Sequence, residues 1–141
     1  MSSVDLLIAK YVNAAIRHKE GYTSGNSKKA NAAADALAEV AADLDCHGDL
    51  GKAALAQLMD HGSMAVRCSA ARDCLFLPDH GNKARQTLSE IARQDEGLIG
   101  FDAEMVLKVW DKGDLHDPWP STQATCKCGA CRRPGEASGS T

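Results

Sequence analysis

Apolar residues recur every three or four positions in six segments of the chain. This spacing places them on one face of an α-helix, as Val4, Tyr11 and Ala15 illustrate for the first segment. No segment shows the strict alternation of apolar and polar residues that is typical of a half-buried strand. The pattern therefore predicts six helices, over residues 2–18, 27–48, 49–62, 63–77, 82–94 and 100–113.

Capping and turn residues indicate where these helices begin and end. Asn26 or Ser27, Asp49 and Ser63 each precede an apolar run and are candidate N-caps. The stretch KEGYTSGNS at residues 19–27 contains two glycines, so we expect the first helix to end there.

The connections between the predicted helices are only a few residues long, which favours antiparallel neighbours. Aromatic residues make up only 4% of the chain, and the abundant alanines suit closely packed helices. We predict an all-α fold over residues 1–115, a short stack of three antiparallel helical hairpins. From residue 116 onward prolines and small polar residues replace the periodicity, so residues 116–141 are expected to form a flexible tail that contains cysteines.

Charge and hydrophobicity argue against several classes of partner. The chain carries 16 Lys and Arg against 19 Asp and Glu, a formal net charge of −3, which disfavours a nucleic-acid partner. No stretch approaches the ~18 consecutive apolar residues that a membrane span needs. The first residues lack the basic start of a signal peptide, so the expected location is the cytoplasm.

The third and fourth predicted helices resemble a HEAT repeat. The sequence LGKAALAQLMDHGSMAVRCSAARDCL at residues 50–75 has an aspartate (Asp60) in its turn, followed by Val66-Arg67 and paired alanines. In HEAT repeats an aspartate and an arginine at these places brace the turn, and small residues allow close stacking. The resemblance therefore implies that Asp60 and Arg67 have a structural role.

Three longer motifs extend a resemblance over most of residues 4–113. They are KKANAAADAL, LMDHGSMAVRCSAA and, most distinctive, GLIGFDAEMVLKVWDKG. In these motifs the chain resembles a family of small bacterial helical proteins known only as a domain of unknown function. The resemblance implies a HEAT-like helical fold without a catalytic mechanism. Relatives of this kind look like accessory or immunity proteins of bacterial toxin systems.

Half of the six cysteines lie close together beyond the helical region. Cys126, Cys128 and Cys131 form one CxxC knuckle plus a third thiol. Structural zinc is usually held by four ligands, often from two such knuckles. His116 is the nearest candidate for a fourth ligand; Cys46-His47 or a second chain could also supply it. One interpretation is a zinc-binding accessory protein, and the other is a tail with incidental thiols.

The predicted helices carry no motif of a known catalytic site. There is no glycine-rich phosphate loop, no HExxH and no sequence context for a Ser-His-Asp triad, so we expect no enzyme activity. Cys68 and Cys74 lie in an apolar helix, where free cysteine behaves as a small hydrophobe. Asp102 follows the start of the last helix; it either complements the helix N-terminus or contacts a partner.

These observations favour a non-catalytic protein-binding module, such as an immunity or accessory protein of a bacterial toxin system. No resident cofactor is expected apart from zinc at the tail cysteines. In a stack of helical hairpins, the second helices of the pairs form one continuous face. The candidate partner-binding residues on that face are Asp35, Glu39, Arg67, Arg72, Glu104 and Lys108.

Overall fold

The computed structural model describes residues 3–119, and these residues form an all-α fold. Over this range there are six α-helices, one 3-10 turn and no strand, which confirms the predicted fold class. The elements are α1 (Ser3–Thr23), α2 (Ser27–Asp45), α3 (Gly48–Gln57), the 3-10 turn η1 (Leu58–Asp60), α4 (Met64–Cys74), α5 (Gly81–Gln94) and α6 (Leu98–Asp111).

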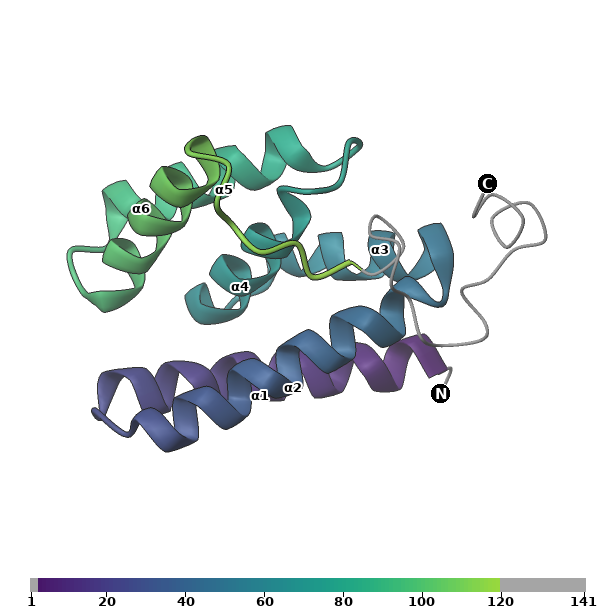
Figure 1. Ribbon diagram of the computed structural model, residues 1–141, viewed down its shortest axis with the longest axis horizontal. Coiled ribbons are helices and arrows are strands. Elements are labelled where there is room, and N and C mark those ends of the chain that lie inside the picture. The colour runs from purple at the N-terminus through teal and green to yellow at the C-terminus, as the bar shows by residue number, and fades with distance from the viewer. Residues whose placement is uncertain (1–2, 120–141) are drawn as a thin grey trace.

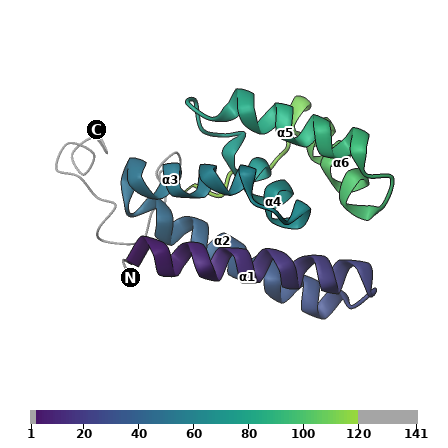
Figure 2. The same cartoon turned by 180° about the vertical axis from the view of Figure 1, so that it is seen from behind.

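The helices are stacked in three tiers that follow chain order. α1 and α2 form a long hairpin at the bottom of the view, α3 and α4 lie across it, and α5 and α6 form the third tier (Figures 1 and 2). The middle tier is therefore covered on both sides, and α4 contributes many of the buried positions. Its buried residues are Ala65, Val66, Cys68, Ala70, Ala71, Asp73 and Cys74.

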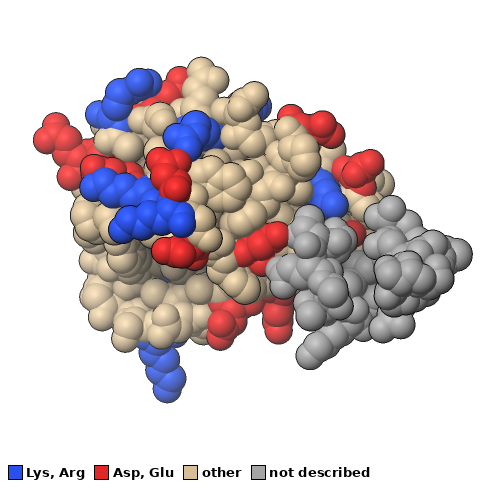
Figure 3. Space-filling view, turned by 45° about the horizontal axis from the view of Figure 1, so that its top comes forward, with Lys and Arg blue, Asp and Glu red and all other residues tan. Residues whose placement is uncertain are grey.

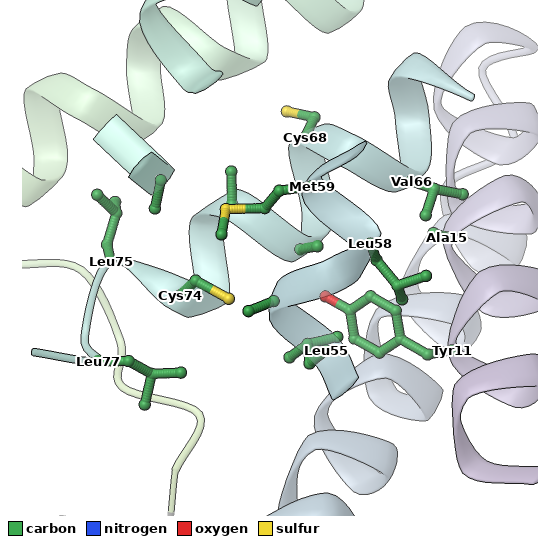
Figure 4. Packing of buried hydrophobic residues seen from close by; sticks show 14 of the residues in the cluster. Tyr11, Ala15, Leu55, Leu58, Met59, Val66, Cys68, Cys74, Leu75 and Leu77 are labelled. Atoms are coloured by element: carbon green, nitrogen blue, oxygen red, sulfur yellow. The ribbon is translucent and has the colours of Figure 1, made fainter. Parts of the chain in front are cut away.

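The hydrophobic core lies between these tiers. Tyr11 from α1, Leu55 from α3 and Val66 from α4 are fully buried and point into the same region (Figure 4). Leu88 and Ile91 of α5 extend the core on the other side of α4. Burial of a single Leu, Val or Ile side chain stabilises a fold by roughly 1.5–3 kcal/mol, so this cluster is the main source of stability.

α1 continues through the glycine that was expected to end it. Gly21 is buried inside the last turns of α1, and a Cβ atom added there would lie 2.6 Å from the backbone nitrogen of Ala30. The glycine thus lets α1 and α2 approach each other closely. The chain turns four residues later at Gly25, whose φ of +74° favours glycine, and Asn26 caps α2 by accepting from the Lys29 amide.

We expect Gly21→Ala to lower the free energy of unfolding by about 1–3 kcal/mol, because the added methyl group meets backbone atoms that cannot rotate away. Urea unfolding of the purified protein measures this difference. Gly62→Ala is the matched control, since a Cβ at Gly62 would meet no atom within 4 Å. Equal stability of the two variants would contradict the close approach of α1 and α2.

Of the predicted N-caps of α3 and α4, the structure has only that of α4. Ser63 caps α4 as expected, accepting from the Val66 amide at 3.5 Å. Asp49, in contrast, is not the cap of the third helix, because α3 begins one residue earlier, at Gly48. The helix tightens into η1 at Leu58, so the 3-10 turn takes the place of its predicted last turn.

The packed domain extends beyond the predicted boundary at residue 115. After α6 the chain returns across α4 without helical structure (Figure 1), and it ends the described region at Trp119, whose exposed fraction is 0%. The Trp119 indole Nε1 donates to the Asp73 carbonyl at 2.8 Å, and Arg72 donates to the His116 carbonyl at 3.2 Å. Prolines end helical periodicity, but an extended segment can still bury an aromatic side chain.

Candidate functional site

A groove opens between the α1–α2 hairpin on one side and α4 and α6 on the other. It encloses about 370 Å³, and one face of each of the four helices contributes to it. We call it the central groove. Its lining residues are Ala15, His18, Lys19 and Tyr22 of α1, Ala34, Leu37 and Ala38 of α2, Ala65, Cys68, Ser69, Arg72 and Asp73 of α4, Ile99, Asp102 and Val106 of α6, and His116 and Pro118.

Helical spacing and small side chains explain the groove. The lining positions recur every three or four residues, so each helix presents a single stripe. Ala34, Ala38 and Ala65 have only a methyl group where larger side chains would close the space between the tiers. Such a concave, mostly apolar site with a few polar groups is typical of a binding site, and its volume is near the lower end of the ~300–1,000 Å³ range of ligand pockets.

A buried polar network lies beside the groove and joins α1 to α4. The Tyr11 hydroxyl donates to Asp73 Oδ2 at 2.6 Å and lies 2.9 Å from Ser69 Oγ. Arg72 forms an ion pair with the other carboxylate oxygen of Asp73 at 2.8 Å. Burial raises the pKa of Asp73, while the Arg72 charge and the Tyr11 hydrogen bond act in the opposite direction. The network therefore provides partners for the buried Asp73 carboxylate.

Asp102 lies in the groove wall, and its hydrogen-bond partner is much weaker than those of Asp73. Its carboxylate Oδ2 is 3.9 Å from the Cys68 thiol sulfur, a weak donor. Burial raises the pKa of Asp102, and the nearby His18 and Arg72 partly oppose this. The sequence suggested a first-turn acid at the helix N-terminus, but α6 begins at Leu98, so Asp102 lies in the second turn and faces the groove.

The raised pKa of Asp102 predicts a specific pH dependence of stability. The folded state holds this proton more tightly than the unfolded state, so the contribution to stability is full below about pH 3.9 and is lost as pH rises through the raised pKa. Relative to Asp102→Asn, the wild-type protein should thus lose free energy of unfolding over this range. Urea unfolding at a series of pH values measures it. A difference that does not change with pH would contradict the burial of this carboxyl.

The two free thiols of the described region are poor nucleophiles. Cys68 and Cys74 are both buried. Burial raises the pKa of Cys68 to about 12, and it raises the pKa of Cys74 as well. Because the thiolate is the reactive form, these side chains act as small hydrophobic residues of the core.

Three of the predicted partner-binding residues lie at or near the groove. Arg72 lines it directly. Asp35 and Glu39 are exposed on α2, and each follows a wall residue, Ala34 or Ala38, by one position. One position corresponds to a rotation of about 100° around the helix, so both carboxylates lie next to the wall without forming it.

The other three predicted residues make contacts of their own. Arg67 donates to the carbonyls of His61 at 2.8 Å and Gly62 at 3.1 Å, so it braces the turn before α4. Glu104 and Lys108 form an exposed ion pair along α6, with 3.7 Å between Oε2 and Nζ. None of the three lines the central groove. Asp60, expected to brace the same turn, is instead paired with Lys83 of α5.

Of the predicted zinc ligands, the structure describes the candidates for the fourth position, His116 and the Cys46-His47 pair. Cys126, Cys128 and Cys131 lie outside the described residues. His116 lines the groove, and its carbonyl accepts from Arg72. Within residues 3–119, no group of three or more His, Cys, Asp and Glu side chains could hold a metal ion.

The charged side chains of both signs are mixed on the surface. On the face shown in Figure 3, most Lys and Arg side chains lie beside Asp and Glu rather than in one basic area. Two ion pairs from α5, Lys83–Asp60 and Arg85–Asp111, are examples of this arrangement. None of the helices in the described part of the chain is long and apolar enough to cross a membrane.

Fold and groove together define a small all-α stack with a concave site between its tiers. The chain belongs to the family described as Domain of unknown function (DUF2019), whose model matches residues 5–111. No curated protein matches the sequence.

A solved structure with the same fold is the crystal structure of the protein RPA1889 from Rhodopseudomonas palustris CGA009. It superposes with a TM-score of 0.71 at 23% sequence identity, over 82% of this chain and 94% of that one. At this level of identity, the similarity establishes a shared fold.

Sequence reasoning did not single out the groove itself or the role of Trp119. The wall residues have the same spacing as core residues, so the pattern cannot separate a filled interface from an open one. The one usable signal was Asp102, an acidic residue between Ile99 and Val106 on the apolar stripe of its helix.

Proposed function

We propose that the protein is a non-catalytic, protein-binding module and that the central groove receives part of its partner. The observation that carries this proposal is the groove, which is lined by apolar wall residues and bordered by charged side chains. Apolar pockets with a polar rim are where protein interfaces concentrate their binding energy.

The chemistry of the lining residues supports binding rather than catalysis. The thiol that lines the groove, Cys68, has a raised pKa and stays protonated at neutral pH. Arg72 and Asp73 are engaged with each other. A nucleophile activated by a neighbouring base, as covalent catalysis needs, is not assembled among the lining residues that the structure describes.

The arrangement of the tiers supports a more specific proposal about the partner. Paired helices stacked in chain order are the architecture of HEAT-type repeats, and Arg67 braces the turn as it would in such a repeat. In this form of the proposal the protein neutralises or accompanies a bacterial toxin, and the toxin supplies the segment that enters the groove.

Site-specific photocrosslinking tests the proposal. A photoreactive residue replaces either Ala38, an exposed wall residue of the groove, or Ala53, an exposed residue of α3 outside it. In cells that naturally produce the protein, we expect Ala38 to give one defined protein adduct and Ala53 not to give it. The same adducts from both positions, or no protein adduct together with an activity found in a metabolite screen, would refute the proposal.

A further inference from the structure

The half-buried carboxylate of Asp102 has one weak hydrogen-bond donor from the protein. Buried polar groups in folded proteins nearly always have a partner of good geometry. The thiol of Cys68, at 3.9 Å, is a weak donor. Because Asp102 is half-buried and the lining residues around it include Ile99 and Val106, part of the water that would hydrate an exposed aspartate is displaced. A ligand that brings a strong donor to Asp102 would offset this cost.

The nearby positive or polar groups already have contacts of their own. Arg72 is paired with Asp73 at 2.8 Å and donates to the His116 carbonyl at 3.2 Å. The His18 ring stacks on Tyr22, with 6.1 Å between the ring centres. The charges of Arg72 and Asp73 balance within their pair, so the other charged lining residues are Asp102 and Lys19.

The surroundings of the groove carry the same sign. Asp35 and Glu39 are exposed on α2 beside the wall, and Lys19 of α1 is the exposed cation among the lining residues. With Asp102, carboxylates outnumber Lys19, and the whole chain has a net charge of −3. Complementary potentials steer oppositely charged groups into such a site.

The shape of the groove selects among cationic groups. Leu37, Ile99 and Val106 line it together with alanine methyl groups, and the enclosed space is about 370 Å³. The side chains of lysine and arginine have an aliphatic stem that packs on apolar surface and a charged head that binds a carboxylate. A compact inorganic cation would leave the apolar walls uncovered.

We propose that the central groove binds a lysine or arginine side chain of a partner protein, with its aliphatic stem on the apolar walls and its cationic head on Asp102. This inference rests on the proposed function and names the residue that anchors the partner. Asp35 and Glu39 then interact with further basic residues that flank the inserted side chain.

Titration with blocked amino acids tests the inference without knowledge of the partner. The probes are the N-acetyl, N-methylamide derivatives of lysine, arginine, norleucine and glutamate; norleucine has the stem of lysine without the ammonium group. The readout is the methyl resonances of Leu37, Ile99 and Val106 in correlation spectra of the full chain. We expect saturable shifts with lysine and arginine in the millimolar range, and binding of norleucine about tenfold weaker.

Two variants complete the test. Asp102→Asn should weaken lysine binding about tenfold, to the level of norleucine. Asp49→Asn removes an exposed carboxylate of α3, outside the groove, and should leave lysine binding unchanged. Equal binding of norleucine and lysine, preference for glutamate, no effect of Asp102→Asn, or no shifts with either basic probe would each overturn the inference.

These outcomes are distinct from failure of the proposed function. If the basic probes fail while crosslinking from Ala38 still captures a protein, the anchoring residue is wrong and the binding site remains. If crosslinking from Ala38 fails while the probes bind, the groove recognises a basic group that does not come from a protein partner.

Discussion

Replacing Trp119 by alanine is expected to lower the free energy of unfolding by about 3–5 kcal/mol, the usual cost of removing a fully buried tryptophan. The side chain has an exposed fraction of 0% and lies 46 positions along the chain from Asp73, whose carbonyl its Nε1 binds at 2.8 Å. The substitution would leave a cavity, remove this hydrogen bond and release the segment that returns from α6. Urea unfolding measures the change.

A second substitution of Trp119 separates the hydrogen bond from the packing, and a variant at an exposed leucine serves as the control. Trp119→Phe keeps most of the ring but leaves the Asp73 carbonyl without its donor, so a loss of about 1–3 kcal/mol is expected. Leu98→Ala, at a side chain that is 45% exposed, should change stability by less than about 1 kcal/mol. If Trp119→Ala behaves like Leu98→Ala, the packed domain ends before this residue, as the sequence first suggested.

Asp73→Ala is expected to be comparably destabilising, by about 3–5 kcal/mol, because it removes a buried carboxylate that accepts from two partners. The Tyr11 hydroxyl and the Arg72 guanidinium both bind this carboxylate, at 2.6 and 2.8 Å. The variant should also loosen the contact between α1 and α4. Thermal or urea unfolding gives the stability, and the protection of α1 amides from hydrogen exchange reports the contact.

Two more variants measure the contribution of the Tyr11 hydrogen bond and provide a control for the loss of an aspartate. Tyr11→Phe removes one hydrogen bond to a charged group and should cost about 1.5–3 kcal/mol. Asp79→Ala, at an exposed position just after α4, should stay within about 0.5 kcal/mol of the wild-type protein. An Asp73→Ala variant as stable as Asp79→Ala would mean that the Tyr11–Asp73–Arg72 network does not hold the two tiers together.

The helices could be predicted from the sequence because their signals are local. Periodic alanine and leucine positions define the apolar stripes. Ser63 caps α4 by accepting from the Val66 amide three residues later, so the start of this helix depends on neighbouring residues alone. Gly21 shows the limit of this approach. Whether a glycine ends a helix or permits a neighbour to approach depends on what packs against it, and here that is the backbone of Ala30.

Long-range contacts explain what the sequence did not reveal. Trp119 lies between Pro118 and Pro120 in a segment without periodicity, and its burial depends on Asp73 in a distant helix. Asp102 faces the groove because α6 begins at Leu98 and packs closely on the preceding turn at Gly100. A Cβ there would lie 1.8 Å from the carbonyl oxygen of Asp95. The sequence contains no local signal for the burial of Trp119, and for Asp102 its only signal is the position of an acidic residue on the apolar stripe of its helix.

If the groove between the tiers binds a protein partner, filling the groove must lower the affinity of that partner. Once the partner is identified, calorimetry compares the wild-type protein with Ala38→Trp, which fills the groove from an exposed position, and with Ala53→Trp on α3. We expect Ala38→Trp to weaken binding by about 30-fold or more, the effect of losing a contact worth about 2 kcal/mol, and Ala53→Trp to bind with the wild-type affinity. Equal affinity of Ala38→Trp and the wild-type protein would contradict binding of the partner in the groove.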